Sequence, residues 1–172
     1  MSLKNLLVIF LLSFSFILPV QAASEIGLPV RLKIPKIKVN AIVESVGLLP
    51  NGAMGVPKIP RNAGWYKLGP RPGEIGSAAI AGHLNWWNGA VSVFAKLSKL
   101  KLGDKIIVQD KNGIDIVFVV RKISLLGSQE DASEVFVSDD GMAHLNLITC
   151  GGTWNKITKQ YSKRLVIFAD KE

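Results

Sequence analysis

The chain is predicted to fold as a mostly β domain, a closed barrel or a sandwich, rather than as a parallel α/β sheet. Short runs of apolar and β-branched residues alternate with Gly, Pro, Asn and Asp, and we count about eight such runs. Only residues 91–100 have helical spacing of their apolar positions. Closure into a barrel also removes the exposed edges that short strands would otherwise present.

The N-terminus carries a leader. Lys4 precedes an apolar run over residues 6–20, and small residues follow at 22–24. This order is typical of a secretory signal, and the run approaches the ~20 residues that span a bilayer. We expect residues 1–23 to be a cleaved signal peptide or a retained membrane anchor. In either case the rest of the chain works outside the cytoplasm, secreted or at the extracytoplasmic face of the membrane.

The remaining residues are enough for one domain with a core of its own. We expect residues 24–30 to be a linker and residues 31–172 to form that domain. The net charge is +8, from 21 basic and 13 acidic side chains, and the lysines are scattered rather than massed in a tail. We interpret them as a solvated surface and expect no nucleic-acid partner.

In the first half of the domain, residues 31–39 alternate charged and apolar side chains, which predicts a half-buried strand. Pro35 cannot donate to a ladder, so it breaks this strand or confines it to an edge. A second strand is expected over 41–48, ending at the turn 49–52. Residues 61–76 are dense in Gly and Pro and are expected to be irregular, with a short strand at most.

The second half continues the pattern of short strands. A strand of small residues over 77–82 ends at His83, and a helix is expected over 91–100. The further expected elements are strands over 105–109 and 114–123 joined by a turn at 110–113, a polar connection over 125–140 with one helical turn at 131–135, and strands over 145–150 and 164–169.

Cys150 is the only cysteine of the chain. It is expected to end the strand 145–150, because Gly151 and Gly152 follow and paired glycines mark a turn. Side chains alternate along a strand, so Cys150 points away from the face that the leucines at 145 and 147 bury. A lone cysteine in an exported chain pairs between molecules, stays inert, or is kept because it reacts. A small buried hydrophobe is the common alternative for a free cysteine.

A reactive thiol needs a base or a cation beside it. His144 precedes Cys150 by six residues in one extended strand, roughly 20 Å at ~3.3 Å per residue, and is out of reach. His83 ends another strand and meets Cys150 if both strands end on one rim. Arg164 begins the final strand and can donate to an oxyanion. A loop histidine and a surface arginine are the alternatives.

Taken together, these residues resemble the sortases, cysteine transpeptidases of mainly Gram-positive cell surfaces. The likeness is carried by residues 81–83 (Ala-Gly-His), 147–150 (Leu-Ile-Thr-Cys), 164–166 (Arg-Leu-Val) and the opening Leu-x-Ile-Pro-x-Ile at 32–37, and it covers about 30–171. The family commonly reads Thr-Leu-x-Thr-Cys. This chain has Asn146 at the first of these positions, which leaves the subclass open.

The resemblance implies an eight-stranded sortase β-barrel with one or two short helices. Cys150 would be the nucleophile that cleaves a Leu-Pro-x-Thr-Gly-like sorting signal between Thr and Gly through a thioacyl intermediate. His83 would act as general acid and base, and Arg164 would stabilise the oxyanion. The substrate site is expected to be lined by Thr149, Ala81 and Gly151.

The partners implied by the resemblance are surface proteins with a C-terminal sorting signal, a peptidoglycan precursor or another amine acceptor, and the membrane through the N-terminus. The family needs no cofactor for its chemistry. Some members bind calcium, but no carboxylate cluster for it is identifiable here, and no metal ligand is predicted. No second apolar segment is found near the C-terminus, which favours class A, D, E or F, and among these we favour F.

Two other kinds of exported cysteine enzyme do not match. Cell-wall transpeptidases of the L,D type resemble a Ser-x-Gly-Cys pattern that residues 149–152 do not follow. Papain-like wall hydrolases place Cys before His in the chain. The alternative from another class is a non-catalytic exported β-barrel that binds cell-wall sugar or peptide through its tryptophans, Trp65, Trp86, Trp87 and Trp154.

Overall fold

The computed structural model describes residues 25–86, 89–127 and 130–172. The predicted leader lies outside the described residues. Within the described part of the chain, no helix combines the length and the apolar character needed to cross a membrane.

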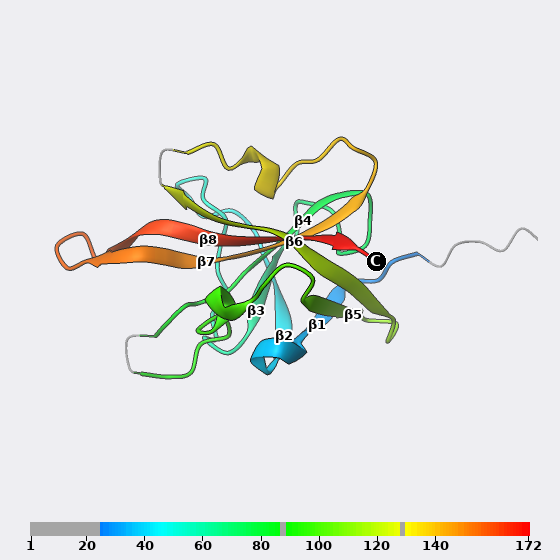
Figure 1. The fold of residues 1–172 in the computed structure, drawn as a ribbon, viewed down its shortest axis with the longest axis horizontal. Coiled ribbons are helices and arrows are strands. Elements are labelled where there is room, and N and C mark those ends of the chain that lie inside the picture. Colours follow the sequence, from blue (N-terminus) through cyan, green and yellow to red (C-terminus); the bar gives the residue numbers. More distant parts are fainter. Residues whose placement is uncertain (1–24, 87–88, 128–129) are drawn as a thin grey trace, which may run out of the picture.

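Eight strands close into one barrel, as predicted (Figure 1). In barrel order, each strand hydrogen-bonds to the next and the last returns to the first. The order is β1 (Pro29–Ile34), β2 (Val39–Val46), β3 (Ala63–Tyr66), β4 (Gly76–Ala81), β7 (Ala143–Asn155), β8 (Gln160–Lys171), β6 (Asp115–Gly127) and β5 (Lys105–Asp110).

The helices are shorter than the sequence predicted. The described residues contain three 3-10 turns, η1 (Pro35–Ile37), η2 (Leu97–Lys99) and η3 (Ser133–Val135). The predicted helix over 91–100 is wrong apart from η2. The hydrogen bonds of this segment span three residues, from the amides of Ala95, Leu97 and Leu100 to the carbonyls of Ser92, Phe94 and Leu97. They form successive tight turns rather than an α-helix, whose bonds span four residues.

Side chains alternate between the barrel interior and its outside along β7 and β8. Leu145 and Leu147 point inward and are fully buried. Outside the barrel, Val166 and Phe168 of β8 form a second apolar cluster with Val135 of η3. The connection between β6 and β7 therefore packs over the outer face of β7 and β8 and forms a second, smaller core.

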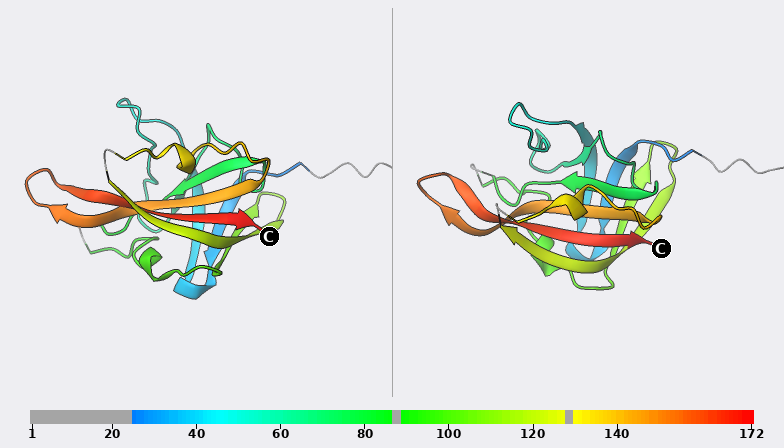
Figure 2. Two further views of the ribbon diagram at one scale, coloured as in Figure 1. Left: turned by 45° about the horizontal axis from the view of Figure 1, so that its top comes forward. Right: turned by 90° about the horizontal axis from the view of Figure 1, so that it is seen from above.

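Strand β7 is longer than expected and does not end at Cys150. At Cys150 the strand pairs with Arg164 of β8, whereas its parallel pairing with β4 ends two residues earlier, at Ile148. Cys150 therefore lies near the rim of the barrel, with a strand partner on the β8 side. Gly152 has φ 73°, in the left-handed region, and the pairing with β8 slips by one residue between Gly151 and Trp154. Gly152 and Thr153 thus lie opposite the single residue Ser162 and form a bulge, not a chain-reversing turn. Beyond the bulge, β7 and β8 continue as a hairpin that extends from the barrel (Figure 2).

The N-terminal segment is fastened at the opposite end of the barrel. The amide of Gly27 donates to the buried carboxylate of Asp110 at 2.9 Å. Arg71 donates to the carbonyl of Ile26 at 2.6 Å. Because β1 runs from this end toward the end where Cys150 lies, the chain enters the barrel at the end opposite the thiol.

His144 lies at that same opposite end of β7 and, as predicted, away from Cys150. Only 2% of its surface is exposed. Its Nδ1 lies 2.7 Å from Asp170 of β8 and its Nε2 lies 2.9 Å from Asp140. Both ring nitrogens therefore face carboxylate oxygens, one from the end of β8 and one from the segment before β7. Arg121 adds an ion pair to Asp170 at 2.7 Å.

The pKa of Asp140 lies at about 2, below its ordinary value of 3.8. The hydrogen bond from His144 is the main cause, and those from the Met142 amide and the Ser138 hydroxyl add to it. The carboxylate of Asp140 thereby ties the residues before β7 to the barrel. A depressed pKa in the folded state stabilises the fold at pH values above the unfolded pKa.

We predict that Asp140→Asn lowers the melting temperature at pH 6, because a charged acceptor of three hydrogen bonds is lost. The difference from the wild type should shrink as the pH falls from about 4 toward 2, where Asp140 itself takes up a proton. Thermal melts of both proteins across this pH range test the prediction. Asp139→Asn, one residue away, is the control. If this variant lost as much melting temperature as Asp140→Asn, and did so equally at every pH, the prediction would be contradicted.

Candidate active site

Three neighbouring strands bring His83, Cys150 and Arg164 to one end of the barrel. The parallel ladder pairs Ala81 with Ile148 and continues one step further, because the amide of Gly82 donates to the carbonyl of Ile148 at 3.0 Å. His83 therefore follows β4 at the level where Cys150 stands in β7.

On the other side of the thiol, β8 supplies the arginine. Cys150 and Arg164 are direct partners in the antiparallel β7–β8 ladder, which places their Cα atoms ~5 Å apart. Ile148 and Val166, two residues away in each strand, belong to the outer apolar cluster. Alternation then directs the side chains of Cys150 and Arg164 to the same outer face.

The ring of His83 is held from two sides. Its Nε2 lies 2.9 Å from the carbonyl oxygen of Pro57, and Trp86 packs edge-on with ring centroids 4.6 Å apart. A carbonyl oxygen only accepts, so Nε2 is the donor in this bond. Within the described chain, no hydrogen bond joins the sulfur of Cys150 to this ring or to the guanidinium of Arg164.

The guanidinium of Arg164 is exposed and bonded only to nearby backbone. Its Nη1 donates to the carbonyls of Lys163 at 3.0 Å and Tyr161 at 3.3 Å. No carboxylate among the described residues pairs with Arg164. Among the described residues, therefore, no acidic side chain neutralises the positive charge that Arg164 carries near the thiol.

Two groups that support His83 were not anticipated from the sequence. Pro57 acts through its carbonyl, and the loop that carries it is organised by Glu44 of β2. This carboxylate accepts from the amide of Lys58 at 3.0 Å and from the side chain of Asn62 at 2.8 Å. Burial raises the pKa of Glu44, but these hydrogen bonds, with one from the Ile59 amide, outweigh it and leave the pKa below the ordinary value.

The predicted substrate-lining residues take different positions. Thr149 is 2% exposed, and its hydroxyl donates to the carbonyl of Gly82 at 2.7 Å, so it fastens β4 to β7 and is not free to line a groove. Ala81 lies on the outer face beside Ile148 and is buried. Gly151 packs closely against β8, since an added Cβ would lie 3.1 Å from the amide nitrogen of Leu165.

The three tryptophans that the structure describes do not form one exposed binding surface. Trp65 is buried, with its indole N–H bonded to the carbonyl of Pro70. Trp86 is half-buried against His83, and Trp87 lies outside the described residues. Trp154, in the hairpin, is 49% exposed. The alternative of a tryptophan-based binding barrel keeps only this last residue as a freely exposed ring.

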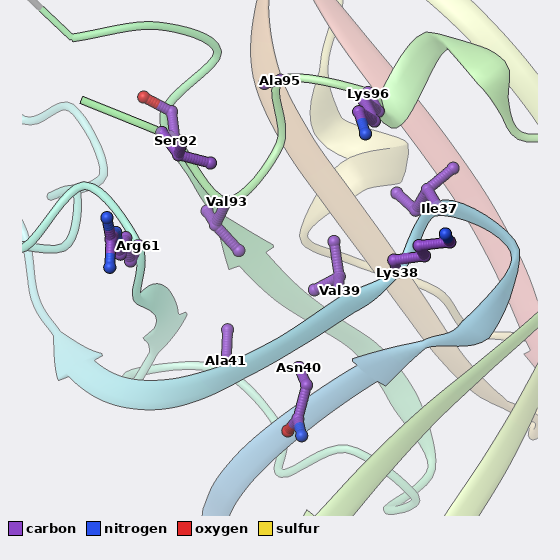
Figure 3. Close-up of a pocket in the computed structure, with 11 residues that line it drawn as sticks. Ile37, Lys38, Val39, Asn40, Ala41, Arg61, Ser92, Val93, Ala95 and Lys96 are labelled. Carbon is purple, nitrogen blue, oxygen red and sulfur yellow. The ribbon is translucent and has the colours of Figure 1, made fainter. Parts of the chain in front are cut away.

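A hollow of about 230 Å³ lies at the same end of the barrel, between η1, the start of β2 and the segment 91–96 (Figure 3). Val39, Ala41 and Val93 contribute apolar side chains to it, and Lys38 and Lys96 are among its polar residues. None of His83, Cys150 and Arg164 lines it. In the described part of the chain, no group of three His, Cys, Asp or Glu side chains is placed to hold a metal ion.

The fold is similar to that of several solved structures, although no curated protein matches the chain. Solved structures that share the fold include a lid mutant of sortase A from Corynebacterium diphtheriae, with TM-score 0.66, 20% identity, and coverage of 87% of this chain and 72% of that one. Sortase C-1 from Actinomyces oris gives TM-score 0.65, 22% identity and coverage of 83% and 72%.

A Clostridium perfringens sortase D5 transpeptidase is also similar, with TM-score 0.62, 20% identity and coverage of 85% and 79%. Some sortases are longer, and the chain covers 63% of a sortase C1 of GBS pilus island 1. At these identities the structures establish the fold. The family model for the sortase domain matches residues 32–172, most of the chain. The protein therefore belongs to the sortase family.

Proposed function

We propose that the protein is a cysteine transpeptidase that cleaves a Leu-Pro-x-Thr-Gly-like sorting signal between Thr and Gly. The observation that carries this proposal is the alignment of His83, Cys150 and Arg164 on three adjacent strands at one end of the barrel. Membership of the sortase family supports the reaction class.

In the first step the thiolate of Cys150 attacks the carbonyl carbon of the signal's threonine. The tetrahedral oxyanion collapses, the C–N bond to glycine breaks, and the leaving amine takes a proton from His83. In the second step an acceptor amine attacks the thioacyl carbon and returns a proton to His83, which releases the thiolate. The acceptor keeps the acyl group as a new amide, so atoms and charge balance over the cycle.

The bond between His83 and Pro57 supports proton transfer through Nδ1. With Nε2–H held by the carbonyl, the ring keeps its orientation in both protonation states. Nδ1 then carries the exchanged proton. Glu44 supports this arrangement from a distance, because it orders the loop that presents the Pro57 carbonyl.

Arg164 is proposed to stabilise the oxyanion. Its present partners are two backbone carbonyls in β8, and a rotation of an exposed side chain would exchange them for substrate oxygen. A guanidinium offers several N–H donors in a fixed plane, which suits an anionic oxygen. We propose that the reaction takes place outside the cytoplasm, with an N-terminal anchor or secretion, on surface proteins and a cell-wall amine.

We predict that Cys150→Ala abolishes cleavage of a quenched Leu-Pro-x-Thr-Gly peptide, because the alanine has no nucleophile. Fluorescence measures cleavage, and mass spectrometry should find a thioacyl adduct in the wild type only. Residual steady-state turnover in the variant would refute the nucleophile. A thermal melt matching the wild type is the control that separates lost chemistry from lost fold.

For Arg164→Ala we expect kcat to fall by about 10²–10³, the effect of removing one oxyanion donor. Arg164→Lys keeps the charge but loses the planar set of donors, so its kcat should lie between that of the wild type and that of Arg164→Ala. Single-turnover acylation rates measure the step directly. Wild-type acylation in Arg164→Ala would remove the proposed role.

A further inference from the structure

The hairpin beyond Cys150 is unusual in its surface chemistry. Residues 151–163 contain three basic side chains and no acidic one, and the basic residues are Lys156, Lys159 and Lys163. None of the three lysines makes an ion pair with any described residue. Trp154 is 49% exposed and Ile157 is 92% exposed. Single exposed apolar residues are ordinary, but aromatic and aliphatic groups gathered among uncompensated charges mark an interaction surface.

This hairpin is built as a defined structure. The carbonyl of the Asn155 side chain accepts from the amides of Ile157 and Thr158 at 2.8 and 3.0 Å and closes the turn. Lys159 takes φ 53°, a left-handed conformation that few non-glycine residues adopt. Because the backbone of the turn is already fixed, little of its conformational entropy is lost when its side chains bind a partner.

An aromatic pair forms the stem of the hairpin. Trp154 and Tyr161 face each other across the strands with ring centroids 5.1 Å apart. The hydroxyl of Tyr161 accepts from Asn85 at 2.9 Å, which ties the hairpin to the segment after His83. The tilted pair leaves half of the tryptophan exposed, and an indole surface of this kind packs well against the C–H face of a sugar ring.

We propose that this hairpin, residues 151–163, is a docking surface for an anionic glycopolymer, a chain of sugars that carries phosphate or carboxylate groups. The lysines complement the anions and Trp154 packs on the sugars. The hairpin extends from the end of the barrel opposite to the one where the N-terminal segment enters (Figures 1 and 2). That direction favours a polymer over a membrane attached to the N-terminus. The proposal is independent of the peptide-cleaving reaction.

The test compares two double variants of the full chain that change the net charge equally. Lys156→Glu with Lys159→Asn alters the hairpin, with Asn chosen because it tolerates the left-handed conformation. Lys67→Glu with Lys99→Asn removes the same charge from two exposed lysines elsewhere, which also make no ion pair with described residues. Binding to alginate, a carboxylated glycan, is measured at low salt by interferometry, with neutral dextran as the uncharged probe.

We expect the hairpin variant to bind alginate about ten-fold more weakly, equivalent to ~1.4 kcal/mol, and the matched control to stay within about two-fold of the wild type. Equal losses in both variants would show a response to net charge alone and overturn the proposal. Undiminished binding by the hairpin variant would also overturn it. Tighter hairpin-dependent binding to phosphatidylglycerol vesicles than to alginate would assign the surface to membranes instead.

Trp154→Ala tests the sugar contact separately. It should weaken binding to alginate but leave binding to polyphosphate, an anion without sugars, unchanged. Trp154→Phe keeps a ring and should retain most of the alginate affinity, which distinguishes lost stacking from a lost hairpin. Equal losses on both polymers, or no loss on alginate, would contradict the assignment of a glycan.

Discussion

The parallel pairing of β4 with β7 is the interaction on which the site depends. It is continued past the end of β4 by the amide of Gly82 bonded to Ile148 and by the hydroxyl of Thr149 bonded to Gly82. These two bonds fix the level at which His83 leaves the sheet. A one-residue slip would reverse every side chain of β4 relative to β7 and would separate the imidazole from the thiol. The register of this pair therefore serves the chemistry as well as the fold.

Close packing around Gly82 supports that register. A Cβ at this position would lie 2.4 Å from Phe94 and 2.6 Å from Val93, so only glycine lets the segment 91–96 lie directly on the strand end. The amides of Val93 and Phe94 donate to the carbonyls of Pro60 and His83 and hold the start of this segment against the barrel. Further along, its hydrogen bonds span three residues rather than four, so tight turns stand where the apolar spacing predicted a helix.

Much of the fold was predictable because it rests on local patterns. Alternating side chains and Gly- or Asn-containing turns located the strands, and the outward direction of Cys150 followed from the leucines of its own strand. The end of β7 was misjudged, because Gly151 and Gly152 have the same sequence signature in a bulge as in a turn. Pro57 and Glu44 could not be found, since Pro57 acts through its backbone carbonyl and Glu44 reaches His83 only indirectly, by ordering the loop that carries Pro57. Thr149 was expected at the substrate site from the family resemblance, and its hydroxyl bonds to the carbonyl of Gly82 inside the protein.

The attachment of residues 25–28 to the base of the barrel has a practical consequence. Glu172, at the end of β8, lies at that base too, where its amide bonds to the carbonyl of Val117, so both ends of the described chain leave the molecule on the side remote from the sulfur. A fusion partner, an affinity tag or a solid support joined directly before Glu25 or after Glu172 would leave the end of the barrel that carries Cys150 unobstructed. Since the entering segment is bonded to Asp110 and Arg71 rather than trailing freely, such a coupling would also hold the barrel in a defined orientation.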